Sequence, residues 1–256
     1  MTKKEQQFIE LLDKWELDIF SIQSLKRDYG IELTEWKSTL RQLIKIGYLK
    51  IIEREKYCRH YFSDEHVIGN YLVPDGVVAY WSALNLHGLT EQFTNTVFVQ
   101  TTKLKKEKWV FGVRYKFIKV LPRKMAGIKL QGFGNHQFRM TDKEKTIVDG
   151  FDLPKYSGGY EEIIKGFYNA RLSSRKLVKY CKAINNISLV KRLAYLTELF
   201  DKPKMEYFIK YALSVRNEKY NLFEHNGEKK GKTNRRWRLV MNLSNAEIKN
   251  LAELHL

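Results

Sequence analysis

The stretch that decides the fold is residues 33–49, LTEWKSTLRQLIKIGYL. At 100° per residue, its apolar side chains fall in one stripe and most of its polar side chains lie on the opposite side. The stripe consists of Leu33, Trp36, Leu40, Leu43 and Ile44. The Thr34 hydroxyl suits the N-cap, and Gly47 suits the position just past the last turn. These residues predict a short amphipathic helix with one face packed and the other free to touch a partner.

Two further helices are expected before this one, and a β-hairpin after it. KKEQQFIELL (3–12) and SIQSLKRDYG (21–30) each place apolar residues on one side, and the second starts at a capping Ser21 and stops at Gly30. YLKIIEREKYCRHYF (48–62) alternates well enough for two strands joined at EREK. This order predicts a winged helix-turn-helix, whose third helix would enter a DNA major groove.

The residue types on the free face favour DNA, although another interpretation stays open. The carboxylates of Glu35, Glu53 and Glu55 repel phosphate, and they favour a small packing unit whose polar helix face is solvated or contacts protein. Against this, Arg41 suits guanine and Gln42 suits adenine. The hairpin adds the cations Arg54, Lys56 and Arg59. DNA binding is the interpretation that these side chains favour.

Composition predicts two domains. The chain has 256 residues, of which 43% are hydrophobic, so it can bury a sizeable core. We expect a winged helix over residues 1–65 and a larger α+β domain over residues 66–256. The connection SDEHVIGN (63–70) is too short, and too apolar at its flanks, for a free linker. The two domains should therefore lie close together.

The sequence also predicts a cytoplasmic protein without a membrane partner. No apolar run approaches the roughly 20 residues that span a bilayer, and the start, MTKKEQQ, lacks a signal-peptide core. The two cysteines, Cys58 and Cys181, are far apart in sequence and offer no disulfide framework. A reducing compartment fits this pattern.

The formal net charge of +17 predicts a polyanionic or acidic partner. Residues 1–63 carry 12 basic and 10 acidic side chains, residues 64–151 carry 13 and 8, and residues 152–256 carry 21 and 11. Within residues 36–63, however, seven basic side chains face two acidic ones. Outside this region, the loop KLKKEKW either adds contacts to the DNA backbone or is a solvated connection. Its cations are Lys103, Lys105, Lys106 and Lys108.

The rest of the chain mixes strand and helix patterns, which predicts an α+β fold with a helical C-terminal half. Strands are expected at TNTVFVQTT, VRYKFIKVL, HQFRM and RRWRLVMNL, and helices at VVAYWSALNLHGL, TDKEKTIVDGF, most of 160–215 and SNAEIKNLAEL. The first of these helices should end at Gly88. Two others should begin with capping boxes, Thr141 with Glu144 and Ser244 with Glu247.

No pattern predicts catalysis, a metal or a cofactor. TDKEKT lacks the D…(D/E)xK spacing of nucleases, and the capping box explains it better. Cys58, His60, Asp64 and His66 lack the paired spacing of a zinc site. GFGN and SGGY have no phosphate-loop context. We therefore expect a binding protein rather than an enzyme.

Several stretches of the chain together resemble one family. They are YLVPDGVVAYWSALNLHGL (71–89), NTVFV (95–99), RMTDKEKTIVDGF (139–151) and RRWRLVMNL (235–243), and they follow the winged-helix start in this order. With these stretches the chain resembles the AbiEi antitoxins of type IV toxin–antitoxin systems over almost its whole length.

The resemblance implies a bifunctional protein. Its winged helix would bind inverted repeats in the double-stranded DNA of its own promoter as a repressor. Its C-terminal domain would antagonise a nucleotidyltransferase-like toxin without a stable complex. The DNA-binding role carries over to Thr34, Lys37, Ser38, Arg41, Gln42, Lys45, Arg54, Lys56 and Arg59. An alternative stays open, in which the basic C-terminal domain grips RNA or an acidic protein and the winged helix is a scaffold.

Overall fold

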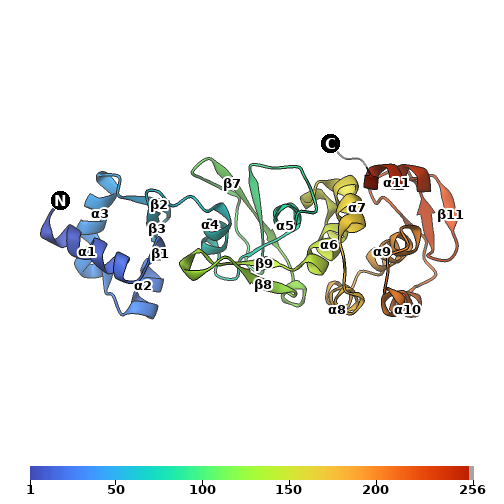
Figure 1. Ribbon diagram of the computed structural model, residues 1–256, viewed down its shortest axis with the longest axis horizontal. Coiled ribbons are helices and arrows are strands. Elements are labelled where there is room, and N and C mark those ends of the chain that lie inside the picture. Colours follow the sequence, from blue (N-terminus) through green and yellow to red (C-terminus); the bar gives the residue numbers. More distant parts are fainter. Residues whose placement is uncertain (254–256) are drawn as a thin grey trace.

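The computed structural model describes residues 1–253. The molecule is elongated, and its parts follow one another in chain order (Figure 1). Three helices and a small sheet lie at one end, a six-stranded sheet lies in the middle, and a helical half with a second small sheet lies at the other end. The predicted α+β class is confirmed. No helix within these residues has the length and apolar character needed to cross a membrane.

The N-terminal unit contains one strand more than expected. Its elements are α1 (Lys3–Lys14), β1 (Ile19–Ser21), α2 (Ile22–Tyr29), the 3-10 helix η1 (Leu33–Trp36), α3 (Lys37–Lys45), β2 (Leu49–Glu53) and β3 (Lys56–Arg59). Strand β1 pairs antiparallel with β3, which pairs antiparallel with β2. With only three residues, β1 is too short to show an alternating pattern in sequence.

The helix ends follow the sequence signals at α2 and depart from them at α3. Ser21 caps α2 by accepting a hydrogen bond from the Ser24 amide at 3.0 Å, and Gly30 ends the helix with a φ of +68°. Thr34, in contrast, lies inside η1 and caps nothing, because α3 begins at Lys37 without a side-chain cap. The predicted single helix is therefore split, with a tighter 3-10 turn in place of its first α-helical turn.

The middle sheet has the order β6-β7-β5-β4-β9-β8, with parallel pairs β5/β7 and β4/β9 among antiparallel ones. Its strands and helices are α4 (Glu65–Leu72), β4 (Val77–Val78), α5 (Tyr80–Leu86), β5 (Thr96–Thr101), β6 (Lys108–Val110), β7 (Val113–Lys119), β8 (Ile128–Gln131) and β9 (Phe138–Thr141). Helix α5 starts later than expected, because Val77 and Val78 form an inner strand. Strand β8 was not expected, since it is a largely exposed edge strand. The short 3-10 helices η2 (Pro122–Lys124) and η3 (Gly134–His136) flank β8.

The C-terminal half is helical, as expected, and contains a small sheet of order β10-β12-β11. Its elements are α6 (Lys143–Asp152), η4 (Pro154–Tyr156), α7 (Gly159–Asn169), α8 (Ser174–Ile184), α9 (Ile187–Leu199), α10 (Glu206–Val215), β10 (Asn221–Leu222), β11 (Lys232–Asn234), β12 (Leu239–Met241) and α11 (Asn245–Glu253). The capping box at Ser244 and Glu247 is confirmed, with hydrogen bonds of 2.7 and 3.2 Å. The box at Thr141 is wrong: Thr141 ends β9 within the sheet, and Asp142 caps α6 by accepting from the Lys145 amide at 2.9 Å.

An apolar core crosses the predicted domain boundary after residue 65. Ile19, Ile52 and Cys58 of the N-terminal sheet are buried in one cluster with Val97 and Tyr115 of the middle sheet. The two parts are therefore close, as the short connection predicted. Removing either part would expose this cluster to water, which is unfavourable in proportion to the apolar area exposed.

A buried ion pair within α6 is bonded to the middle sheet through Gln100. The Lys145 ammonium donates to the Asp149 carboxylate, and both side chains are almost fully buried. Gln100 of β5 donates to the same carboxylate at 3.3 Å. Burial raises the pKa of Asp149, although the Lys145 charge opposes that shift. Breaking such a pair from one side leaves the other charge buried alone.

Candidate nucleic-acid interface

Helix α3 separates a packed face from an exposed one. Leu40 and Leu43 are buried against α1 and β2, and Trp36 packs its ring 5.2 Å from the ring of Phe8. The predicted DNA-contacting side chains of η1 and α3 are all exposed on the surface. They are Thr34, Lys37, Ser38, Arg41, Gln42 and Lys45.

The exposed face of α3 carries hydrogen-bonding groups that are not used within the described chain. Among residues 1–253, the side chains of Lys37, Arg41 and Lys45 have no ion-pair partner, and that of Gln42 has no hydrogen-bond partner. A guanidinium can donate two parallel bonds to guanine, and an amide can pair in two directions with adenine. The face can therefore meet base edges and phosphates without breaking internal bonds.

Arg54 is the one predicted wing cation that is exposed in the described part of the chain. It lies in the turn between β2 and β3, and its side chain is 92% exposed. The next residue, Glu55, has a φ of +63°, and its carbonyl accepts a hydrogen bond from the Ile22 amide at 3.0 Å. The turn is thus braced against α2 while Arg54 points into solvent.

Arg59 does not face solvent, and the expectation that it contacts DNA is corrected. It is 3% exposed. Its guanidinium donates to the Tyr48 hydroxyl at 2.8 Å, to the Leu17 carbonyl at 3.3 Å and to the Asp13 carboxylate. Burial would lower the pKa of Arg59, but the Asp13 hydrogen bond and charge outweigh it and leave the pKa raised. Arg59 of β3 therefore bonds to α1, to the segment after α1 and to the residue before β2 instead of reaching a phosphate.

Lys56 is also engaged within the molecule. Its ammonium donates to the Glu53 carboxylate at 3.1 Å and to the Leu72 carbonyl at 2.9 Å. Lys105 donates to the same two groups, and Lys108 lies 3.5 Å from the Glu53 carboxylate. We name these four side chains, Glu53, Lys56, Lys105 and Lys108, the Glu53 cluster. It joins the wing to the β5–β6 connection, so three of the predicted DNA-contacting lysines are neutralised in part by one carboxylate.

The pKa shifts in the Glu53 cluster follow from this arrangement. Burial alone would raise the pKa of Glu53, but its hydrogen bonds to Lys105 and Lys56 outweigh that effect and lower it. Burial lowers the pKa of Lys56, and Glu53 opposes that change. Lys103 and Lys106 lie outside the cluster and are exposed. Of the four loop lysines, these two stay open to an external partner.

No protein-family model matches the chain, and no curated protein matches it. Among solved structures, the chain is similar to the crystal structure of the RV2827C protein from Mycobacterium tuberculosis. The TM-score is 0.67 at 13% identity, over 98% of this chain and 95% of that chain. The likeness is one of fold.

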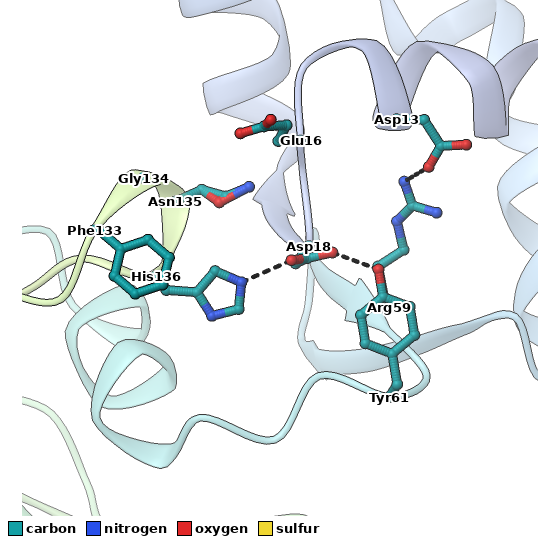
Figure 2. Close-up of a pocket in the computed structure, with 9 residues that line it drawn as sticks. All are labelled: Asp13, Glu16, Asp18, Arg59, Tyr61, Phe133, Gly134, Asn135 and His136. Carbon is teal, nitrogen blue, oxygen red and sulfur yellow. Dashed lines mark hydrogen bonds and ion pairs between the residues drawn. The ribbon is translucent and has the colours of Figure 1, made fainter.

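A cleft of about 390 Å³ lies between the N-terminal unit and the η3 turn (Figure 2). Asp18 lies between the two, with His136 Nε2 at 2.7 Å from one carboxylate oxygen and the Tyr61 hydroxyl donating to the other at 2.6 Å. Burial and the Asp18 bond raise the pKa of Tyr61 to about 12. Asp13 and Glu16 also line the cleft. Three carboxylates repel phosphate, so this side of the unit does not suit nucleic acid.

The exposed cations of the C-terminal half lie where the helical pattern of α8 predicts them. Leu177, Val178 and Cys181 are buried, and burial raises the pKa of the Cys181 thiol. The side chains expected outside this stripe are exposed: Arg175, Lys176, Lys179 and Lys182. Lys176 pairs with Asp142 at 3.0 Å. The exposed surface of α8 is therefore basic.

The β6–β7 hairpin exposes two aromatic residues, Trp109 and Phe111, that were not among the residues expected at the interface. The available signal was Gly112 alone, which suits the second position of a two-residue hairpin turn between strand-forming residues. The role of Asp64 as a helix cap was also not expected. Its carboxylate caps α4 by accepting hydrogen bonds from the amides of His66 and Val67 at 3.0 and 3.1 Å. Asp64 therefore has a structural role at the start of the second part.

Proposed function

We propose that the chain is a DNA-binding repressor and antitoxin of a type IV toxin–antitoxin system. The observation that carries the DNA-binding part is the face of α3, where base-reading side chains lie exposed and unengaged above a buried apolar stripe. Arg41 and Gln42 would read base edges, and Lys37, Lys45 and Arg54 would meet phosphates.

The order of elements supports a winged helix-turn-helix in residues 1–65. Helix α3 follows α2 after Gly30 and the 3-10 helix η1, and the β2–β3 hairpin comes next in the position of a wing. Strand β1 completes a three-stranded sheet behind the helices. In such a unit the second helix of the pair lies in the major groove and the hairpin lies beside it.

Substitution of Arg41 tests the DNA-binding proposal. Arg41→Ala should weaken binding to the promoter of its own gene by about 1–3 kcal/mol, and leave binding to unrelated duplex nearly unchanged. Lys14→Ala, at the exposed end of α1, is the matched control and should bind as the parent does. If the Arg41 variant retains the parent's preference for the promoter, α3 is not the recognition helix.

The antitoxin part of the proposal rests on the family resemblance of the sequence. The shared core argues against testing it with a truncated chain, because deletion of residues 1–65 would uncover Val97 and Tyr115. We would instead express the full chain with Arg41→Ala and Gln42→Ala, together with a nucleotidyltransferase-like toxin, from an unrelated promoter. Rescue of growth by this variant supports separable repression and neutralisation. If the cells die as they do with toxin alone, although the folded variant is present, the antitoxin part is wrong and the chain is a DNA-binding regulator only.

A second candidate is an RNA- or protein-binding module in which the winged helix is a scaffold. The Glu53 cluster favours it, since the wing bonds to the middle sheet rather than standing free. The exposed cations Arg175, Lys179 and Lys182 would then contact the partner. Two results together would select this candidate. The parent protein would not bind the promoter, and replacing all three cations would abolish binding to the partner.

A further inference from the structure

The β6–β7 hairpin carries a strained aromatic residue at its tip. Its two-residue loop is Phe111–Gly112, with φ of +50° and +83°. This turn favours Asn, Asp or Gly at its first position, because a Cβ in the left-handed region crowds the following carbonyl. Phe111 is nonetheless 44% exposed, so full burial does not compensate for the strain. Backbone strain of this kind concentrates at functional positions.

The hairpin and the loop before it expose other large apolar side chains. Trp109 is 61% exposed and Leu104 is 86% exposed. The Asn95 side chain donates to the Gly112 carbonyl at 2.8 Å, which braces the tip. Single exposed apolar residues are ordinary, but three on one braced hairpin and its loop mark a contact surface.

The sequence around this apolar tip is rich in basic residues. Residues 103–119 hold seven basic side chains and one acidic one, which is +6 of the net +17. The acidic one, Glu107, pairs with Arg114 at 2.6 Å, whereas Lys103 and Lys106 are exposed. Exposed rings between cations suit nucleic acid, because the cations meet phosphates while the rings meet sugars and bases. An acidic protein face would satisfy the lysines but would set charged groups against the rings.

The tip lies beside the proposed recognition unit. The Lys50 ammonium of β2 is 5.3 Å from the centre of the Phe111 ring. Lys50 follows Lys45, the last residue of α3, by five residues, so their Cα atoms are at most about 19 Å apart. This upper limit leaves the ring beside Lys50 within reach of the minor groove next to the major groove of α3, since the two grooves are roughly 12 and 6 Å wide. A thin hairpin tip fits the minor groove, whereas a helix does not.

We propose that the β6–β7 hairpin is a second DNA-contacting element. It presses Trp109 and Phe111 against the minor groove beside the major groove that α3 occupies. Lys103 and Lys106 lie at the other end of the hairpin and would meet phosphates farther along the duplex. This inference rests on the proposed DNA-binding function of α3. A DNA contact by Phe111 explains why an exposed ring occupies a backbone conformation that a glycine or an asparagine would adopt more easily.

Two variants of the hairpin test the proposal, and a third residue serves as control. Phe111→Asn fits the turn better than the parent residue, and Trp109→Thr retains strand propensity. Phe133→Asn removes a ring that is 81% exposed after β8, at the opposite edge of the sheet. The full chain is bound to the promoter duplex of its own gene, with affinity, hydroxyl-radical protection of the minor groove and unfolding temperature as readouts.

We expect Phe111→Asn and Trp109→Thr each to weaken promoter binding about tenfold, equivalent to 1.4 kcal/mol, and to lose minor-groove protection beside the α3 site. Phe111→Asn should unfold at the same or a higher temperature, which separates a binding role from a folding role. Phe133→Asn should match the parent.

Three outcomes overturn the proposal. If Arg41→Ala loses promoter preference while both hairpin variants bind and protect as Phe133→Asn does, α3 reads DNA and the hairpin does not. If the hairpin variants lose only toxin neutralisation, the hairpin contacts protein. If Arg41→Ala and the hairpin variants all bind as the parent does, the DNA-binding function itself is wrong.

Discussion

The Lys105 ammonium donates to both carboxylate oxygens of Glu53, at 2.7 and 2.9 Å, and so joins the β2–β3 hairpin to the middle sheet. Lys105 also donates to the Leu72 carbonyl at 2.9 Å, as does Lys56 of the wing. One carboxylate therefore binds cations from two parts of the chain, because Lys56 is 3 residues from Glu53 in sequence and Lys105 is 52 residues from it. The wing cannot shift relative to the sheet without breaking several of these bonds together.

The Glu53 cluster should make stability depend on pH at the acid end. The usual pKa of Glu53 is 4.5, and its folded-state pKa is lower. Its ionised form thus adds stability above 4.5, and that stability is lost as pH falls through the lowered pKa. Glu53→Gln should cost about 0.5–1 kcal/mol near neutral pH. Thermal unfolding measured at falling pH should show the gap between parent and variant closing.

Glu55→Gln is the control for this measurement, because Glu55 is an exposed wing carboxylate outside the Glu53 cluster. It should unfold as the parent does at every pH. A gap between parent and Glu53→Gln that stays constant down to the most acidic pH contradicts an ionic role for Glu53.

Substitution of Arg59 should lower stability, whereas substitution of Arg41 should leave stability nearly unchanged. Arg59→Met leaves the Leu17 carbonyl and the Tyr48 hydroxyl without their buried donor, so it should lower the free energy of unfolding by about 1–3 kcal/mol. Arg41→Met, on the exposed face, should change stability by less than about 0.5 kcal/mol. Chemical denaturation measures both. Equal losses of stability would show that the exposed face of α3 is packed in solution.

The loop lysines should differ in their effect on the salt dependence of DNA binding. Lys106 is exposed, so Lys106→Ala should flatten the slope of log affinity against log salt by about 0.9, the value for one phosphate contact. Lys105 is held by Glu53, so Lys105→Ala should leave the slope nearly unchanged and lower the unfolding temperature instead. Titrations at several salt concentrations compare the two. The reverse ranking would mean that the Glu53 cluster opens when DNA binds.

Substitution of the buried Lys145–Asp149 pair of α6, which packs on the middle sheet, should lower stability more than substitution of the other polar residues discussed above. Lys145→Met leaves the Asp149 carboxylate buried without its partner and should cost about 3–5 kcal/mol. The double variant Lys145→Met, Asp149→Leu removes both charges and should recover much of that loss. Urea unfolding measures the free energies. Additive losses in the double variant would contradict the paired arrangement.

Local patterns predicted much of the fold and the exposure of the polar face of α3. The 3.6-residue period of α3 and α8 assigned Leu40, Leu43 and Leu177 to the core and Arg41 to the surface, and the structure agrees. The helix signals at Ser21 and Gly30 held because the hydroxyl and the left-handed glycine act on the nearest turn of the backbone. These features depend on neighbours within a few residues, which the sequence displays directly.

The availability of the wing cations depended on contacts between distant segments. Arg54, Lys56 and Arg59 look alike in sequence, yet Arg54 is exposed, Lys56 meets Glu53 and Leu72, and Arg59 is buried. The strain at the Phe111 turn likewise became visible only once the strands had paired. The type and charge of each side chain are properties of the sequence alone, and so are the periods that make helices. Whether a given cation faces water or a carboxylate is settled by long-range packing, because charges interact through space with whatever group the fold brings within a few ångströms.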